Sequence, residues 1–315
     1  MDKHKPIVSV CCLVYNHEPY LRECFEGFIM QQTTFPIEIL VHDDASTDHS
    51  ADIIREYTAK YPDLFKPIFQ TENQYSKGVD VFSINAKRAQ GKHIAVCEGD
   101  DYWTDPLKLQ KQVGFLEKHP EVSYVFSKHK KLINGEFESL PQKWNEIPPI
   151  TDLHFLLKNS IMPPTQTICF RKTAYPKQFP QIDTNRGDFV MLVVLTHNSK
   201  IGYIPEEMAV YRVGVGVISK RNILEWEAKD RIANIKLGEY LNDSSYDFCF
   251  NKKRINEYYY QNITYYYLKK KQFIKATITW LKKNWWHLTQ SKKTYLTDNW
   301  LFNKHFLKSI ITRSN

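Results

Sequence analysis

The sequence lacks the usual marks of a secreted or membrane-spanning protein. Its six cysteines include no C-x-x-C pair and no spacing typical of a disulfide framework, which indicates reduced thiols in a cytosolic protein. It has no run of 18 apolar residues, so we expect no transmembrane helix. Residues 1–6 are polar and lead directly into an apolar run, so we expect no signal peptide. With 315 residues, 42% of them hydrophobic, the chain can form one large α/β domain with additions or two smaller domains.

Acidic residues are scarce in the last fifth of the chain. Residues 250–315 contain 14 lysines and arginines and 15 aromatic residues, against two acids, Glu257 and Asp298. Their net charge is about +12 and that of the whole chain is +8, so the remainder carries about −4. A basic, aromatic segment can lie on an anionic membrane, bind nucleic acid or form a solvated helical hairpin. We favour the membrane surface, because tryptophans occur near lysine pairs, and we expect no nucleic-acid partner.

The first 120 residues alternate between apolar runs and helical periodicities. The apolar runs predict strands at 7–14, 37–41, 67–69 and 94–97, with helices between them. This β-α-β-α-β-α-β order is typical of a doubly wound α/β sheet. Beyond residue 120 the pattern predicts strands at 122–126, 165–170, 201–204 and 208–213, a loop with a hairpin at 127–150, and helices at 151–158 and 187–197. From residue 221 onward we expect a helical extension, with helices at 222–241, 255–271 and 272–283.

Polar side chains follow three of the predicted strands at the point where each strand ends. These side chains are Tyr15, Asp43, Asp44, Glu98, Asp100 and Asp101. In open α/β sheets, ligands bind at the carboxyl ends of the strands, so we expect these side chains to converge on a site. Like charges this close raise one another's pKa unless a cation lies between them, and a hard divalent cation suits oxygen ligands. The alternatives are a solvated acidic turn at 98–101 and simple helix caps at 43–44.

Five segments, taken in order, resemble family 2 glycosyltransferases with the GT-A fold. They are Val8-Ser9-Val10 through Val14-Tyr15-Asn16, Asp43-Asp44-Ala45-Ser46-Thr47-Asp48, Glu98-Gly99-Asp100-Asp101-Tyr102-Trp103, Gly187-Asp188-Phe189 and Val210-Tyr211-Arg212-Val213. The resemblance covers residues 5–220, roughly two-thirds of the chain. It implies a GT-A-type doubly wound mixed sheet flanked by helices. The implied transferase domain is 1–220, with a nucleotide-binding half at about 5–120 and an acceptor half at about 121–220, followed by a basic helical region at 221–315.

The resemblance also implies how the donor nucleotide is held. Tyr15 would stack on the base, and Asp44, with Asp43 beside it, would hydrogen-bond the base or the ribose. The family often has a histidine after its Tyr-Arg segment that contacts the diphosphate, but here Gly214-Val215-Gly216 occupies that place. The candidates for supplying the missing positive charge are Lys77, Arg212 and Lys220.

The acidic segments would carry the chemistry. Glu98-Gly99-Asp100 stands in for the family's D-x-D motif. The spacing leaves open whether Asp100 or Asp101 ligates the metal directly, and we favour Asp101, with Asp100 toward the ribose. Asp188 would be the general base that takes the proton from the acceptor hydroxyl, although it could instead be only an acid in the first turn of a helix.

We therefore interpret the sequence as an inverting glycosyltransferase of the hexosyl or N-acetylhexosaminyl type that depends on Mg²⁺ or Mn²⁺. Its donor would be a nucleotide-diphosphate sugar, with uridine diphosphate preferred to thymidine diphosphate. Its acceptor would be a glycan or a lipid-linked sugar in surface polysaccharide assembly, at the inner face of the cell membrane. A nucleotidyltransferase would need a glycine-rich basic loop where Tyr15-Asn16-His17-Glu18 stands. The remaining alternative is a non-catalytic module that binds sugar nucleotide or membrane.

Overall fold

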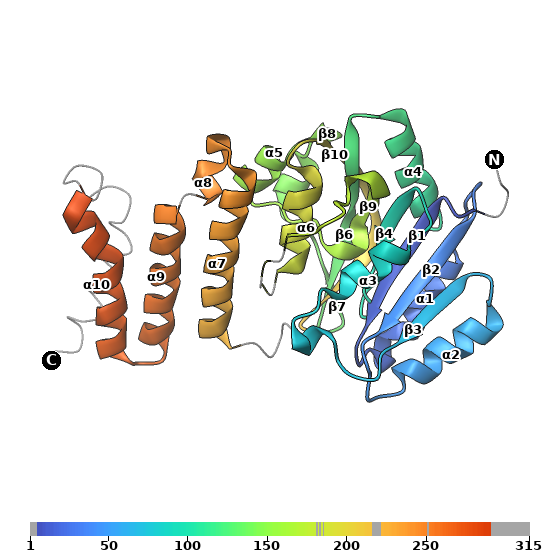
Figure 1. The fold of residues 1–315 in the computed structure, drawn as a ribbon, viewed down its shortest axis with the longest axis horizontal. Helices are drawn as coiled ribbons and strands as arrows, with labels where there is room; N and C mark the ends of the chain where they lie inside the picture. The colour runs from blue at the N-terminus through green and yellow to red at the C-terminus, as the bar shows by residue number, and fades with distance from the viewer. Residues whose placement is uncertain are drawn as a thin grey trace. The chain divides into compact units, whose positions relative to one another are not determined.

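The structure is a computed structural model that describes residues 5–180, 182, 184, 186–215, 222–250 and 252–290. It divides into two compact units, Met1–Arg221 and Asn222–Asn315, and each is described by itself (Figure 1). The first unit is built on a sheet flanked by helices, and the described part of the second unit is helical.

The strands of the first unit form one mixed sheet (Figure 1). Their bounds are β1 Val8–Val14, β2 Ile37–Asp43, β3 Phe65–Phe69, β4 His93–Val96, β5 Tyr102–Trp103, β6 Val122–Ile133, β7 Glu136–Glu138, β8 Ile150–Thr151, β9 Ile168–Arg171 and β10 Lys200–Val213. The order across the sheet is β3-β2-β1-β4-β9-β6-β10-β5, with β7 on β6 and β8 on β10. β3, β2, β1 and β4 run parallel, whereas β9 is antiparallel to both β4 and β6. The carboxyl ends of β1, β2 and β4 therefore lie at one edge, as the alternating pattern predicts.

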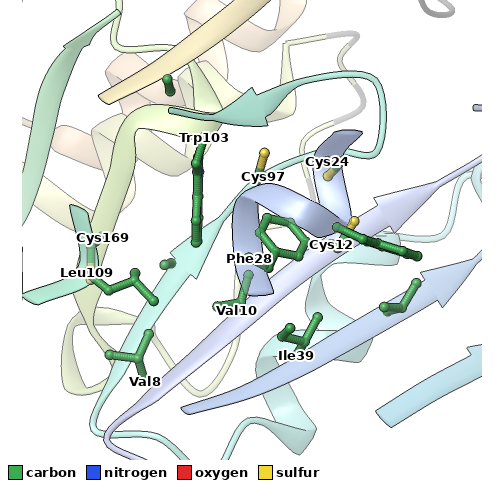
Figure 2. Close-up of a cluster of buried hydrophobic side chains, with 14 of the residues drawn as sticks. Val8, Val10, Cys12, Cys24, Phe28, Ile39, Cys97, Trp103, Leu109 and Cys169 are labelled. Atoms are coloured by element: carbon green, nitrogen blue, oxygen red, sulfur yellow. The ribbon is translucent and has the colours of Figure 1, made fainter. Parts of the chain in front are cut away.

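Helices cover both faces of this parallel part. The helices of the unit are α1 Glu18–Ile29, α2 Ser50–Lys60, α3 Val81–Arg88, α4 Lys108–Lys118, α5 Leu153–Lys158 and α6 Gly187–Thr196. One face of β1, with Val8, Val10 and Cys12, shares a buried apolar cluster with α1, α2 and α4 (Figure 2). Cys11 points to the other face, close to Arg88 of α3. Burial on both faces explains why residues 8–14 are almost continuously apolar rather than alternating.

The structure corrects the sequence-based expectation in the second half of the unit. Residues 127–150 were expected to be a loop with a hairpin, but β6 continues to Ile133 and forms the hairpin with β7. The two strands expected at 201–204 and 208–213 are one long strand, β10, which pairs with β6 through register shifts between Ile204 and Val210. The polar residues that suggested loops lie in this irregular ladder, where the partner strand supplies the hydrogen bonds.

The described helices of the second unit are α7 Ile223–Leu241, α8 Asp247–Phe250, α9 Lys252–Lys269 and α10 Phe273–Gln290. α9 contacts both α7 and α10, and the buried side chains include Leu237, Ile263 and Ala276. Asn222 caps α7 by accepting from the backbone N–H of Leu224. Among the described residues, no helix combines the length and the apolar content that crossing a bilayer requires.

Candidate active site

Hydrogen bonds join the loop that follows β1 to the loop that follows β2. Asn16 has a left-handed backbone (φ 57°), a conformation that asparagine tolerates better than most residues. Its backbone N–H donates to Ser46 Oγ (3.0 Å), and its side-chain Oδ1 accepts from the backbone N–H of Thr47 (2.7 Å). Tyr15, half-buried at the end of β1, is therefore anchored beside the end of β2.

Asp43 and Asp44 lie at the end of β2 and have different surroundings. The Asp44 carboxylate accepts from the backbone N–H groups of Gln74 (2.8 Å) and Tyr75 (3.0 Å), so it holds the loop before α3 in place. Asp43 is 2% exposed, and its Oδ1 has no hydrogen-bond partner among the described residues. Burial raises the pKa of Asp43 above its usual range. An unpaired buried carboxylate oxygen is costly, which makes Asp43 the stronger candidate of the two for a ligand contact.

The turn after β4 carries Glu98, Asp100 and Asp101, and Gly99 has a packing role within it. The backbone N–H of Gly99 donates to the carbonyl oxygen of Leu13 (3.0 Å), which extends the β1–β4 pairing into the turn. A Cβ atom on Gly99 would lie 2.8 Å from His17 Nδ1 and 3.0 Å from Leu21 Cδ1. The close approach of α1 and the preceding loop therefore requires glycine at this position.

The acids of this turn lie close enough together for their charges to interact, and two of them, Glu98 and Asp101, are desolvated. Burial, followed by the charges of Asp100 and Asp188, raises the pKa of Glu98 to about 8. Burial and the charge of Asp100 also raise the pKa of Asp101 well above its usual range, while a hydrogen bond from the backbone N–H of Arg212 to Asp101 Oδ1 (2.7 Å) opposes the rise. Such mutual repulsion would be relieved by a cation among the carboxylates.

Arg212, on β10, connects the acidic turn to α1. Its guanidinium donates to the carbonyl oxygen of Asp100 and forms an ion pair with Glu23 of α1. The guanidinium carbon lies 5.0 Å from the ring centroid of Tyr20 and 4.5 Å from that of Tyr102. The residue is only 8% exposed. These contacts give Arg212 a structural role at the base of the acidic turn.

Asp188 lies in the first turn of α6, and its charge acts on the same acidic turn. Its side chain reaches solvent, but the surrounding protein desolvates it and raises its pKa. Its Oδ1 accepts from the backbone N–H of Phe189 (2.8 Å), and the charge of Arg186 acts against the rise in pKa. Because the charge of Asp188 contributes to the raised pKa of Glu98, the structure brings together two segments 90 residues apart in the sequence.

Sequence reasoning missed two side chains of this site. Burial and the charges of Asp101, Glu98, Asp100 and Asp188 raise the pKa of Tyr211 to about 12, so its phenol lies among all four acids. His17 Nε2 lies 3.9 Å from Asp100 Oδ2. Tyr211 precedes Arg212 in a segment that the resemblance already singled out, so its position was a usable signal.

The other cationic candidates are placed differently. Lys77 is about half exposed and pairs with Glu72 of its own loop. Lys220 lies outside the described residues. Gly214 follows β10 with a left-handed backbone (φ 86°), which favours glycine at that position. The structure therefore brings Arg212, but not Lys77, into contact with the acidic turn.

The acidic turn can be tested for its fit to a divalent cation. Asp100 Oδ1 is buried and has no hydrogen-bond partner among the described residues. The part of the chain that the structure describes contains no group of three or more His, Cys, Asp or Glu side chains arranged to hold a metal ion by themselves. Mg²⁺-type sites commonly take one or two carboxylates and fill their other positions with phosphate oxygens and water. The residues present fit that kind of site.

Comparison with known proteins identifies the family. The family model described as "Glycosyl transferase family 2" matches residues 9–179. The chain belongs to glycosyl transferase family 2. An uncharacterized protein of Mycobacterium tuberculosis is 38% identical over 210 residues, 65% of this chain, and the match spans only 58% of that relative's length. The Escherichia coli UDP-Glc:alpha-D-GlcNAc-diphosphoundecaprenol beta-1,3-glucosyltransferase WfaP is 28% identical over 225 residues, 70% of this chain and 82% of its own.

Solved structures confirm the predicted GT-A fold of this family 2 member. Staphylococcus aureus TarS 1–349 in complex with UDP-GlcNAc superposes with a TM-score of 0.60 at 17% identity, covering 92% of this chain and 94% of its own. The mannosyltransferase PcManGT from Pyrobaculum calidifontis, in complex with GDP-Man and Mn²⁺, gives a TM-score of 0.53 at 14% identity, covering 98% of this chain and 85% of its own. At these identities the likeness concerns the fold alone.

Proposed function

We propose that this family 2 glycosyltransferase is an inverting enzyme that moves a hexosyl or N-acetylhexosaminyl group from a UDP-sugar to an acceptor hydroxyl. The observation that carries the proposal is the gathering of Glu98, Asp100, Asp101 and Asp188 in one desolvated site at the carboxyl end of the sheet. WfaP is named for UDP-Glc, and TarS was solved with UDP-GlcNAc, which supports uridine diphosphate as the donor nucleotide.

The donor nucleotide would lie over the ends of β1 and β2. Tyr15 would stack on the base, and the unpaired Oδ1 of Asp43 would accept a hydrogen bond from the base or ribose. Asp44 would support this contact by holding the loop that follows β3. Lys77 is already paired with Glu72, and Arg212 is held by Glu23 and by the carbonyl oxygen of Asp100. We therefore assign Arg212 to positioning the acidic turn, with direct contact to the diphosphate as the alternative.

Asp100 and Asp101 would hold the divalent cation, with Glu98 beside them. The unpaired Oδ1 of Asp100 supports Asp100 as a direct ligand, because Asp101 Oδ1 already accepts a hydrogen bond from Arg212. When bound, Mg²⁺ or Mn²⁺ would act as a Lewis acid that stabilises the charge developing on the leaving diphosphate. PcManGT was solved with Mn²⁺, which supports a metal-dependent enzyme.

Asp188 would remove the proton from the acceptor hydroxyl as that oxygen attacks the anomeric carbon. Burial raises its pKa, which brings its basicity closer to what a general base needs near neutral pH. Attack from the side opposite the diphosphate inverts the anomeric configuration. Tyr211, whose pKa is raised by burial and by the charges of the four acids, would orient the acceptor or the base.

The acceptor and the location follow from the relatives and from the basic extension. WfaP is named for an acceptor linked to diphosphoundecaprenol, and a related protein of Bacillus subtilis is named as a putative teichuronic acid biosynthesis glycosyltransferase. We propose a glycan or lipid-linked acceptor in surface polysaccharide assembly, reached from a peripheral position on the membrane. The second candidate function is a non-catalytic sugar-nucleotide-binding module, which the glycines after Val213 favour.

A panel of nucleoside diphosphates tests the donor site. A ligand that binds only the folded state raises the melting temperature by mass action. We expect UDP with Mn²⁺ to stabilise the protein, and we expect Asp101→Ala to abolish the metal-dependent part of the shift. Asp52→Ala, which removes an exposed carboxylate from α2, is the matched control and should keep the full shift. The absence of a shift with every nucleotide would contradict the proposal.

A further inference from the structure

The helix α10 displays an apolar stripe on its exposed face. The stripe consists of Ile274, Ile278 and Leu281, which are 79%, 48% and 49% exposed. Their spacing of four and three residues places them on one face of an α-helix. An isoleucine that is four-fifths exposed is an unfavourable arrangement in water, and three in a row along one helix face indicate a surface that is covered in use.

The opposite face of α10 is firmly packed, so the exposure of the stripe is not the result of a loosely attached helix. Ala276 is fully buried, and Thr279 Oγ1 accepts from Thr264 Oγ1 of α9 (3.0 Å). Lys283 is 2% exposed, and its ammonium donates to Gln261 Oε1 of α9 (3.3 Å). α10 is therefore fixed by one face and presents the stripe with the other.

Lysines surround the stripe. Lys275 and Lys282 are exposed on the same helix, and three consecutive exposed lysines, 269–271, span the end of α9 and the turn before α10. Residues 252–290 contain nine lysines and arginines against one acid, Glu257. The combination of exposed aliphatic side chains and exposed lysines matches the composition of helices that lie in the plane of an anionic bilayer.

We propose that α10 docks on an anionic lipid surface, with Ile274, Ile278 and Leu281 inserted at the level of the headgroups and the flanking lysines against lipid phosphates. A second copy of the chain is a poorer occupant, because it would bring two strongly positive surfaces together. Lipids supply both the apolar and the anionic contacts that the stripe requires. This inference rests on the second unit alone and holds whether or not the proposed donor and acceptor are right.

Vesicle flotation of the full chain tests the proposal. Wild-type protein should float with vesicles of phosphatidylcholine containing about one-third phosphatidylglycerol and should bind pure phosphatidylcholine much more weakly. The triple variant Ile274→Ser, Ile278→Ser, Leu281→Ser should lower the partition coefficient at least about tenfold on the anionic vesicles. The matched controls are Ile232→Ser on α7 (48% exposed) and Phe137→Ser on β7 (59% exposed), which should bind as the wild type does.

A second variant separates the contribution of the lysine charges to membrane binding from that of the apolar stripe. Lys275→Gln with Lys282→Gln should weaken binding to anionic vesicles by roughly tenfold at low salt and should change little on neutral vesicles. Melting temperatures show whether each variant is folded, and sedimentation velocity shows whether the wild type self-associates. Three results would overturn the proposal: no flotation of the wild type, equal flotation of the triple variant, or a wild-type dimer that the triple variant dissolves.

Discussion

The acidic turn of the first unit and α10 of the second unit carry charge in opposite ways. At residues 98–101 the acids are partly or fully buried and close together, and burial with neighbouring charges raises the pKa of Glu98 and of Asp101. On α10 and the turn before it, five of the lysines are exposed, and exposed apolar side chains lie among them. Buried like charges indicate a missing counter-ion within hydrogen-bond distance, whereas exposed like charges indicate a broad surface of opposite sign.

The comparison predicts that the acidic turn and α10 respond differently to single substitutions and to salt. Interactions within the acidic site are short and shielded from water, so single substitutions there should have large effects that salt hardly changes. Interactions of α10 are shared among several side chains, so each one should contribute little and salt should weaken them together. The following tests go from the largest expected effect to the smallest.

Asp188→Asn should have the largest effect of the substitutions at the acidic site. The amide keeps the shape of the side chain but cannot take a proton, so we expect turnover to fall about 10²–10⁴-fold. Stabilisation by UDP with Mn²⁺ should remain close to that of the wild type, because Asp188 is assigned to the acceptor side. Initial rates with the UDP-sugar that is turned over, measured beside thermal shifts, check both parts.

The control for this test is Asp52→Asn, which changes an exposed carboxylate on α2 and should keep full turnover. Equal rates for Asp188→Asn and the wild type would contradict the assignment of the base and would favour the non-catalytic module. Loss of nucleotide stabilisation in Asp188→Asn would instead move Asp188 to the donor side.

Two arginine–glutamate pairs on α1 test burial directly. Arg212→Met removes the guanidinium that bonds Asp100 and Glu23 in a buried setting, and we expect the free energy of unfolding to drop by about 1–3 kcal/mol. Arg22→Met breaks the exposed pair with Glu56, and we expect little change. Urea unfolding of both variants measures the contrast. If Arg212→Met and Arg22→Met lower the free energy of unfolding by similar amounts, burial does not make the Arg212–Glu23 pair more important for stability than the Arg22–Glu56 pair.

Much of this organisation could be predicted from the sequence, because it depends on local patterns. The continuous apolar run before Tyr15 and the acids after Val96 indicate buried parallel strands that end at a site, and the family comparison and the solved structures confirm the fold. The extent of β6 and β10 could not be predicted, since polar residues such as Lys128 and Lys130 lie in a strand that only its distant partner specifies.

The sequence predicts candidate residues for the site, but it does not predict their contacts. Asp43 and Asp44 are adjacent acids in the sequence. Asp44 holds the loop before α3, whereas Asp43 has a carboxylate oxygen without a hydrogen-bond partner among the described residues. The Arg212 side chain contacts two distant segments, Tyr20 and Glu23 on α1 and Asp100 and Tyr102 at the acidic turn. No periodicity reveals such long-range contacts. The roles of these residues in donor binding remain predictions.

The smallest expected effect concerns His129 on β6, a buried base. Burial and a neighbouring lysine, rather than a carboxylate, shift its pKa. Burial, with a smaller contribution from Lys131, lowers the pKa of His129 to about 4. Its ring packs edge-on against Trp144, with the centroids 5.0 Å apart. Between pH 6.5 and 4 the unfolded chain binds more protons at this position than the folded chain, so stability falls as the pH falls.

We therefore expect His129 to reduce the free energy of unfolding by about 0.7 kcal/mol when the pH drops from 7 to 6. His129→Phe should keep the packing against Trp144 and remove that part of the pH dependence. Urea unfolding at pH 7 and pH 6 gives the change in the free energy of unfolding for the wild type and for the variant. The difference between these two changes is the contribution of His129, because the other titrating groups contribute equally to both. An unchanged pH dependence would mean that His129 has the same pKa in the folded and the unfolded chain, and burial would then not lower the pKa of this histidine.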